Sequence, residues 1–164
     1  MAYKRFTKEA QAVIMGAQKE SENFKHGYIG TEHILLGIML EDGYAKKTIE
    51  SFNIDFDEVR DLVEEYLGFG DYTMPKDELL LTPRTKKLFD ESFVEASRFN
   101  HKYASPEHML LALIKEDDSV AYTLLSKLNV DFKKIEKDLE KYLENKNEKE
   151  DAWEEGVEIR EEKG

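Results

Sequence analysis

Three kinds of residue that can bind a ligand recur in this sequence at a fixed spacing. Thr7 and Thr82 are 75 residues apart, as are Glu32 and Glu107, and the chain's four histidines form two pairs at the same spacing. A carboxylate can receive a guanidinium group. A threonine at a helix start lies beside free backbone N–H groups that attract anions, and imidazoles bind metals. The spacing therefore offers each of these chemistries twice.

These residues belong to an internal repeat that must position them. The stretch HGYIGTEHILLGIMLED at residues 26–42 matches HKYASPEHMLLALIKED at residues 101–117 at an offset of 75. FNIDF at residues 52–56 matches LNVDF at residues 128–132 at an offset of 76. We infer a duplication of a unit of roughly 65 residues.

Each copy of the repeat predicts four helices and no strand. The first helix starts at Thr7 or Thr82, which are good N-cap residues, and the second is apolar nearly all round, as in the centre of a core. The remaining expected limits are these: second helix from Thr31 or Ser105, third helix about 44–52 or 120–128, fourth helix from Asp55 to Leu67 or from Asp131 to Leu143. We expect an all-α fold in which two pseudo-twofold-related four-helix repeats pack into one domain.

The domain is expected to cover residues 1–144. Repeat one covers about 4–67, a linker with two glycines and Pro75 covers 68–80, and repeat two covers about 81–144. Residues 145–164 are mostly Glu, Lys, Asp and Asn, so we expect an acidic flexible tail or linker there.

Composition excludes several functional classes. The 164 residues hold 36 acidic and 24 basic side chains, a formal charge of −12, which disfavours nucleic acid as a partner. There is no cysteine, so disulfides and cysteine-based zinc sites are impossible. No apolar run is long enough to span a membrane, and the N-terminal residues lack a signal-peptide pattern. We therefore expect a cytoplasmic protein without membrane contact.

The duplicated motif resembles the amino-terminal domain of Clp-type AAA+ unfoldases. HGYIGTEHILLG at residues 26–37 and LTPRTKKLF at residues 81–89 carry the resemblance, which is nearest to the ClpC branch of Gram-positive bacteria and covers about residues 4–144. It implies a double-repeat domain that receives substrates and adaptors for a hexameric ATPase ring feeding the ClpP protease. The implied partners are adaptors of the MecA type and arginine-phosphorylated or unfolded proteins.

One hallmark of the complete family protein is missing. No G-x-x-x-x-G-K-[ST] loop occurs in the sequence, so the phosphate-cradling element of an ATPase is absent. The chain is either an excised front domain or a stand-alone regulator that binds adaptors or substrates as a decoy. We expect no catalysis and no cofactor.

The resemblance also implies two phosphoarginine-binding sites, one in each copy. The residues implied are Thr7, Glu32, Thr82, Lys86 and Glu107. A carboxylate would receive the guanidinium, and the helix start would receive the phosphate. The competing interpretation is that each threonine is only a cap and each glutamate only meets the helix dipole.

The two copies differ at three places that bear on these sites. Gln11 stands where the second copy has Lys86, so Arg5 or Lys8 would have to supply the cation in the first copy. Pro106 replaces Thr31 and removes a backbone donor, and Ser105 replaces Gly30 in the same loop. Arg84 is a weaker candidate for the second site.

Two further features favour structural roles. Glu–His neighbours on a helix do not share a face, so we predict no metal site and expect the histidines to hydrogen-bond with loop or helix-end carbonyls. Phe6 and Leu81 directly precede the threonines. They either staple the first helices to the body, which we favour, or offer an apolar patch to an adaptor.

Overall fold

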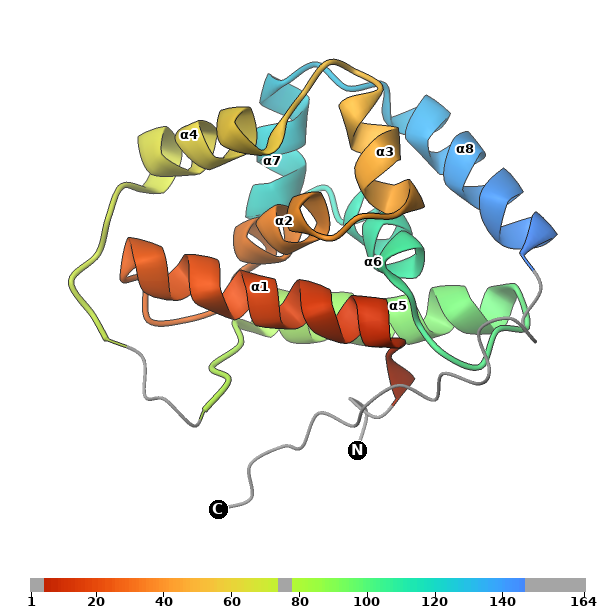
Figure 1. Cartoon of the computed structure of the whole chain (residues 1–164), viewed down its shortest axis with the longest axis horizontal. Coiled ribbons are helices and arrows are strands. Elements are labelled where there is room, and N and C mark those ends of the chain that lie inside the picture. The colour runs from red at the N-terminus through yellow and green to blue at the C-terminus, as the bar shows by residue number, and fades with distance from the viewer. Residues whose placement is uncertain (1–4, 74–77, 147–164) are drawn as a thin grey trace.

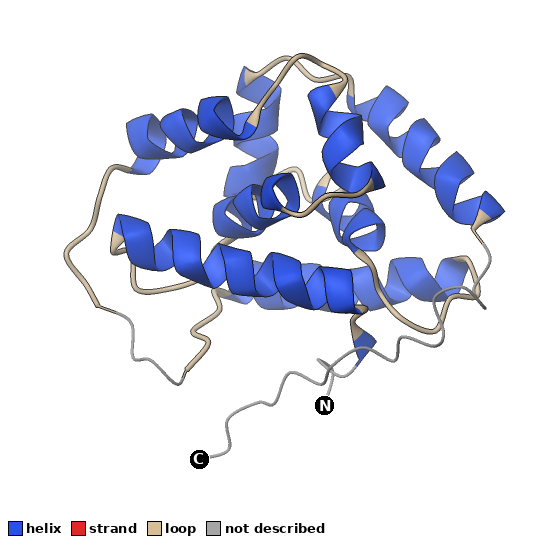
Figure 2. Ribbon diagram, viewed as in Figure 1, coloured by secondary structure: helices blue, strands red, loops and turns tan. Residues whose placement is uncertain are grey.

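The computed structural model describes residues 5–73 and 78–146, and these residues are helical without any strand (Figure 2). The helices are α1 (Lys8–Phe24), α2 (Thr31–Leu40), α3 (Tyr44–Glu50), α4 (Phe56–Leu67), α5 (Pro83–Arg98), α6 (Pro106–Leu113), α7 (Val120–Lys127) and α8 (Phe132–Asn145). The all-α prediction with four helices in each repeat is confirmed. None of these helices combines the length and the apolarity needed to cross a bilayer.

Most helices begin where their capping residues predicted. The Thr7 hydroxyl accepts a hydrogen bond from the Ala10 N–H, and the Thr82 hydroxyl accepts one from the Thr85 N–H, both at 3.1 Å. Asp55 caps α4 with a reciprocal bond to Glu58. Both threonines therefore cap their first helices, as their positions predicted.

Three predicted helix ends were wrong by one or two residues. The third helices are shorter than expected because Asn53 and Asn129 adopt left-handed backbone angles, with φ of 62° and 60°, which turn the chain away. The last helix continues to Asn145, so the first residue of the predicted tail is helical. The rest of that predicted tail, from residue 147 on, lies outside the described residues.

The two repeats interlock rather than stack as separate units. Within each repeat α1 packs on α2 and α5 packs on α6. The third helices cross over: α3 contacts α6 and α8, and α7 contacts α2 and α4. Figure 1 shows α2 and α6 in the middle layer, between α1 and α5 on one side and the remaining four helices on the other. This position explains why α2 and α6 are apolar nearly all round.

Backbone bridges lock this exchange in place. The Thr7 N–H donates to the Ala104 carbonyl at 2.9 Å, and the Ala104 N–H donates to the Arg5 carbonyl at 2.7 Å. A second, pseudo-symmetric bridge joins Ile29 to residues 80–82. In this bridge the Thr82 N–H donates to the Ile29 carbonyl at 3.2 Å. Each first helix therefore starts beside the second helix of the other repeat.

Phe6 has the structural role that we favoured. Its side chain is 0% exposed and packs against the rings of Phe89 and Phe93, with centroids 5.1 and 4.8 Å away. Leu81 is half-buried against the same core. The idea that Phe6 offers a surface patch to an adaptor is wrong for this structure, because the ring is enclosed by the second repeat.

The described part of the linker is fastened to the end of α1. The Gly70 N–H donates to the Phe24 carbonyl at 2.8 Å, and the Tyr72 N–H donates to the Lys25 carbonyl at 3.1 Å. Residues 74–77 of the linker lie outside the described residues.

Replacing Phe6 with alanine tests the interlock. We expect Phe6→Ala to lower the free energy of unfolding by about 3–5 kcal/mol, because it empties a buried aromatic site between the repeats. Urea denaturation followed by circular dichroism measures the loss. Met15→Ala is the matched control, because Met15 is 55% exposed and its truncation should cost less than about 0.5 kcal/mol. Equal losses for the two variants would contradict the role given to Phe6.

Candidate functional site

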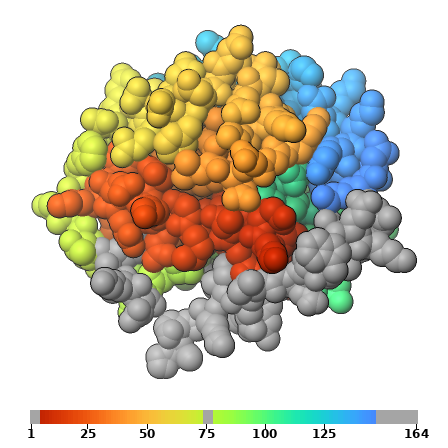
Figure 3. Space-filling view, viewed as in Figure 1, coloured from red at the N-terminus to blue at the C-terminus, as the bar shows by residue number. Residues whose placement is uncertain are grey.

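A cleft of about 230 Å³ opens at the start of α1, where α1, α3 and α6 meet on the face shown in Figure 3. It contains the predicted site residues Thr7 and Glu107. The complete lining is Thr7, Glu9, Asp42, Gly43, Tyr44, Ser105, Pro106, Glu107, Tyr142 and Lys146. Both repeats therefore contribute to it.

We expected each phosphoarginine site to be formed by residues of a single repeat, and this expectation was wrong. Thr7 of the first repeat shares a cleft with Glu107 of the second. The bridge between Ile29 and Leu81 correspondingly sets Thr82 beside the start of α2, which carries Glu32. The physical reason is the backbone exchange described above, which no periodicity in the sequence reports.

Glu107 caps a helix of the other repeat. Its side chain is 5% exposed, and Oε2 accepts a hydrogen bond from the Ala45 N–H at 2.9 Å. The N-cap of α3 is Gly43, which has no side chain to fill this role. Glu107 therefore does interact with the N-terminus of a helix, as the helix-dipole interpretation predicted. That helix is α3 of the other repeat and not α6, which carries Glu107.

The corresponding helix in the second repeat is capped differently. Ser119 caps α7 by accepting from the Tyr122 N–H at 3.1 Å, and the Thr31 hydroxyl accepts from the Ala121 N–H at 3.1 Å. Pro106 cannot supply such a hydroxyl, and Glu107 takes over this function. The second repeat has Pro106 in place of Thr31, and the neighbouring Glu107 supplies the hydrogen-bond acceptor that is lost.

Glu32 does not reach the start of α7; its carboxylate folds back over Gly30 at the start of its own helix. A Cβ atom on Gly30 would lie 2.5 Å from Glu32 Oε1, so this arrangement requires a glycine. Ser105 occupies the equivalent position in the second repeat, and its Cβ excludes the same conformation for Glu107. Gly30 therefore leaves room for the position of the Glu32 carboxylate, and Ser105 does not leave that room for Glu107.

Glu32 is a buried carboxylate without a charged partner in the described part of the chain. It is 2% exposed, and burial raises its pKa, while hydrogen bonds with its own N–H and with Tyr28 act in the opposite direction. The nearest basic atom is His33 Nδ1 at 3.7 Å. Burial, with the neighbouring His26, lowers the pKa of His33 to about 3, so that ring is neutral near pH 7. A buried carboxylate of this kind is costly unless a cation pairs with it.

The first histidine pair forms a hydrogen-bonded chain with a defined tautomer. The Gly30 N–H donates to His33 Nδ1 at 2.9 Å, so His33 carries its proton on Nε2. That proton is donated to His26 Nδ1 at 2.9 Å, and His26 Nε2 donates to the Gly68 carbonyl at 2.7 Å. The prediction of structural hydrogen bonds is confirmed here.

The second pair repeats the core of this arrangement. The Ser105 N–H donates to His108 Nδ1 at 2.9 Å, and His108 Nε2 lies 3.1 Å from His101 Nδ1. His108 is buried, which together with His101 lowers its pKa to about 3. The chain therefore contains two symmetric imidazole pairs at the starts of α2 and α6, and the inner ring of each, His33 or His108, is neutral near pH 7.

We predicted no metal site because adjacent Glu and His residues do not share a helix face, and this reason was wrong for Glu32 and His33. The ligand atoms of His26, Glu32 and His33 lie within 4.8 Å of one another, because Glu32 folds back at the helix start. The hydrogen bonds nevertheless oppose a metal. His33 Nδ1 accepts from the Gly30 N–H, and His33 Nε2 carries the proton that is donated to His26 Nδ1, so neither ring nitrogen of His33 offers a free lone pair. These residues do not fit a metal.

The predicted cationic residues are unevenly placed. Gln11 is buried and its amide donates to the Phe6 carbonyl at 3.1 Å, which is a structural role. The Arg5 guanidinium lies 4.8 Å from the centre of the Phe93 ring and does not line the cleft. Lys86 is exposed on the first turn of α5, and Arg84 pairs with Asp118 at 2.7 Å.

Sequence reasoning missed part of the cleft wall. Tyr142 stacks on Tyr44 with centroids 4.3 Å apart, and Lys146 reaches the cleft from the end of α8. The match of KYL at residues 141–143 with EYL at residues 65–67 was a signal for Tyr142. Lys146 was assigned to the tail, so its place in the wall was not foreseen.

The neutral histidines predict a loss of stability in mild acid. Below the unfolded pKa of 6.5 the unfolded chain binds protons at His33 and His108 that the folded chain, with pKa values of about 3, does not. We expect the free energy of unfolding to fall by about 1 kcal/mol for each of these histidines between pH 7 and pH 5.5, as measured by urea denaturation. His33→Asn should show about half of this pH dependence, and an unchanged free energy across this range would contradict the assignment.

The cross-repeat cap of α3 predicts a graded response at Glu107. Glu107→Ala should lower the free energy of unfolding by about 1 kcal/mol, because the Ala45 N–H loses its acceptor. Glu107→Gln retains an acceptor oxygen and should cost less. Thermal denaturation of the two variants measures the difference, and equal losses would show that the charge, which both variants lack, matters rather than the capping hydrogen bond.

Comparison with known proteins identifies the family to which the repeated sequence and the helical fold belong. The family model described as "Clp repeat (R) N-terminal domain" matches residues 5–96 and 80–159. The chain is 39% identical over 146 residues to a probable ATP-dependent Clp protease ATP-binding subunit of Chlamydia pneumoniae, covering 88% of this chain and 17% of the relative. It is 40% identical over 146 residues to the ClpC subunit of Staphylococcus aureus strain USA300, covering 88% of this chain and 18% of that protein. It thus spans less than a fifth of the length of these relatives.

Solved structures share the fold. The N-terminal domain of ClpD from Arabidopsis thaliana superposes with a TM-score of 0.74 at 24% identity, over 88% of this chain and 98% of that one. The N-terminal domain of Hsp104 from Candida albicans gives a TM-score of 0.70 at 14% identity, over 87% and 94%. The duplicated motif, the eight described helices and these matches show that the chain belongs to the Clp repeat N-terminal domain family.

Proposed function

We propose that this domain is the substrate and adaptor receptor of a Clp-type ATP-dependent unfoldase, and that it recognises arginine-phosphorylated proteins destined for the ClpP protease. The observation that carries the proposal is Glu32. Its carboxylate is buried without a cation among the described residues, beside the start of a threonine-capped helix. A bound guanidinium would supply the missing charge.

The chemistry of phosphoarginine matches this arrangement. Its guanidinium nitrogens donate to a carboxylate, and its phosphate accepts hydrogen bonds and attracts cations. Glu32 would receive the guanidinium. The phosphate would meet the start of α5 at Thr82, where backbone N–H groups and the helix dipole favour an anion.

Lys86 is the cation best placed to assist. In the described chain its ammonium forms no ion pair, whereas the neighbouring Lys87 pairs with Glu116 at 3.0 Å and Arg84 pairs with Asp118. Lys86 is therefore available to the phosphate without first breaking an ion pair. Arg84 would have to leave Asp118 to take part.

The wider role follows from the family. The identity with ClpC-type subunits supports attachment to an ATPase ring, with adaptors of the MecA type and arginine-phosphorylated or unfolded proteins as partners. We propose a cytoplasmic location and no catalysis within this domain. Substrate capture here would precede unfolding by the ring.

A titration monitored by amide chemical shifts tests the proposal. Phosphoarginine should shift the amide signals of Glu32 and Thr82 at concentrations at least about tenfold lower than arginine or phosphate alone, because only it makes both contacts. The absence of any response at millimolar phosphoarginine would refute the mechanism.

Variants separate binding from folding. Glu32→Gln should abolish this response, and it should not lower the free energy of unfolding at pH 7, because it removes a buried charge whose raised pKa disfavours the folded state. Glu64→Gln, on the exposed surface of α4, is the matched control and should bind normally. Unfolding of Glu32→Gln would instead give that glutamate a purely structural role.

A further inference from the structure

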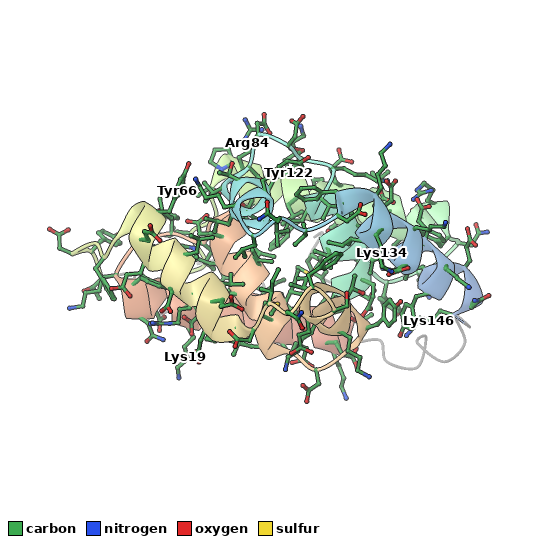
Figure 4. All side chains as sticks on the ribbon, turned by 90° about the horizontal axis from the view of Figure 1, so that it is seen from above. Lys19, Tyr66, Arg84, Tyr122, Lys134 and Lys146 are labelled. Carbon is green, nitrogen blue, oxygen red and sulfur yellow. The ribbon has the colours of Figure 1, made fainter. Side chains whose placement is uncertain are left out.

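The two pseudo-symmetric sites differ in charge. Glu9 occupies the position in α1 that Arg84 occupies in α5, and Gln11 occupies the position of Lys86. The first turn of α1 carries Lys8 together with Glu9, of which only Glu9 lines the cleft, whereas the first turn of α5 carries Arg84 and Lys86 and no acidic residue. Figure 4 shows Arg84 and Lys146, which belong to the two different sites, on separate sides of the molecule.

The cleft at the start of α1 is lined by three carboxylates and one ammonium group. Glu9, Asp42 and Glu107 supply the carboxylates, and Lys146 supplies the ammonium, which lies 3.3 Å from the Tyr142 hydroxyl. Asp42 is exposed and also has Lys46 at 3.3 Å. Burial raises the pKa of the neighbouring Glu41, and the charges of Glu9 and Asp42 add to this shift.

The cleft also has one carboxylate oxygen without a partner among the described residues and an aromatic wall, and the Lys146 ammonium lies 5.3 Å from the centre of the Tyr142 ring. Glu107 is buried, and only its Oε2 atom is engaged, with the Ala45 N–H; the other oxygen has no partner in the described chain. Tyr44 and Tyr142 stack nearly parallel, 1° apart, in the cleft wall. Guanidinium groups bind carboxylates through planar forks and stack on aromatic rings.

We infer that this cleft binds an unphosphorylated arginine side chain and rejects phosphoarginine. A phosphoryl group would bring about two negative charges close to the carboxylates of Glu9, Asp42 and Glu107. The contrast between the sites rests on the proposed function, in which the Thr82 site takes the phosphorylated form. The two halves of the duplication have thereby diverged to read an arginine and a phosphoarginine on the bound protein.

The test uses the complete chain and three probes: N-acetylarginine amide, N-acetyllysine amide and phosphoarginine. Amide signals of Thr7, Gly43 and Ala45 report on the cleft, and those of Glu32 and Thr82 report on the second site. At the cleft we expect the arginine probe to bind at least about tenfold more tightly than phosphoarginine. Equal or tighter binding of phosphoarginine there would overturn the inference, as would tighter binding of the lysine probe.

A charge exchange makes the test sharper. Glu9→Arg copies the residue of the second site and should reverse the preference of the cleft toward phosphoarginine. Glu9→Gln is the control and should weaken arginine binding without creating affinity for phosphoarginine. An unchanged preference in Glu9→Arg would contradict the electrostatic origin of the selectivity.

The two proposals fail in different ways. If Glu32 and Thr82 do not respond to phosphoarginine while the cleft binds arginine, the proposed function is wrong and the cation cleft stands. If the second site binds phosphoarginine and the cleft shows no arginine response, the proposed function stands and the cation cleft is wrong.

Discussion

The exchange of backbone hydrogen bonds between the repeats is the constraint on which the rest of the molecule depends. Because Thr7 bonds with Ala104 and Thr82 bonds with Ile29, each first helix starts against the opposite repeat. The same exchange lets α3 pack on α6 and α8, and lets α7 pack on α2 and α4. Neither repeat encloses its own central helix, so the two share one core and both candidate sites lie at junctions between them.

A single small residue distinguishes the surroundings of the two glutamates. Gly30 leaves room for the Glu32 carboxylate to fold back, where it is buried without a charged partner among the described residues. Ser105 removes that room, and Glu107 instead extends to the uncapped start of α3. One carboxylate therefore carries an electrostatic cost that a ligand can relieve, while the other already stabilises the fold. Equivalent positions in a duplicated sequence have acquired different physical roles.

The histidines connect these sites to the scaffold. Each pair spans the start of a central helix through backbone N–H donors, which fixes the helix start in place. Because the inner ring of each pair is buried, it is held neutral. The loop before each central helix is thus held by hydrogen bonds to a neutral imidazole, and the charge in this region belongs to the glutamates and to the first turns of α1 and α5.

The sequence by itself determined the duplication, the number and starts of the helices, and the family. These follow from local rules: Thr7, Thr82 and Asp55 cap the helices that they begin, and the apolar pattern around residues 34–40 identifies a central helix. It also named Thr7, Glu32, Thr82 and Glu107. The tertiary structure decided which of them meet, because the pairing of Thr7 with Glu107 depends on long-range backbone bonds. It likewise decided that Glu107 caps α3 and that Tyr142 and Lys146 of α8 line the cleft, since such contacts depend on how helices cross rather than on any residue's neighbours in the chain.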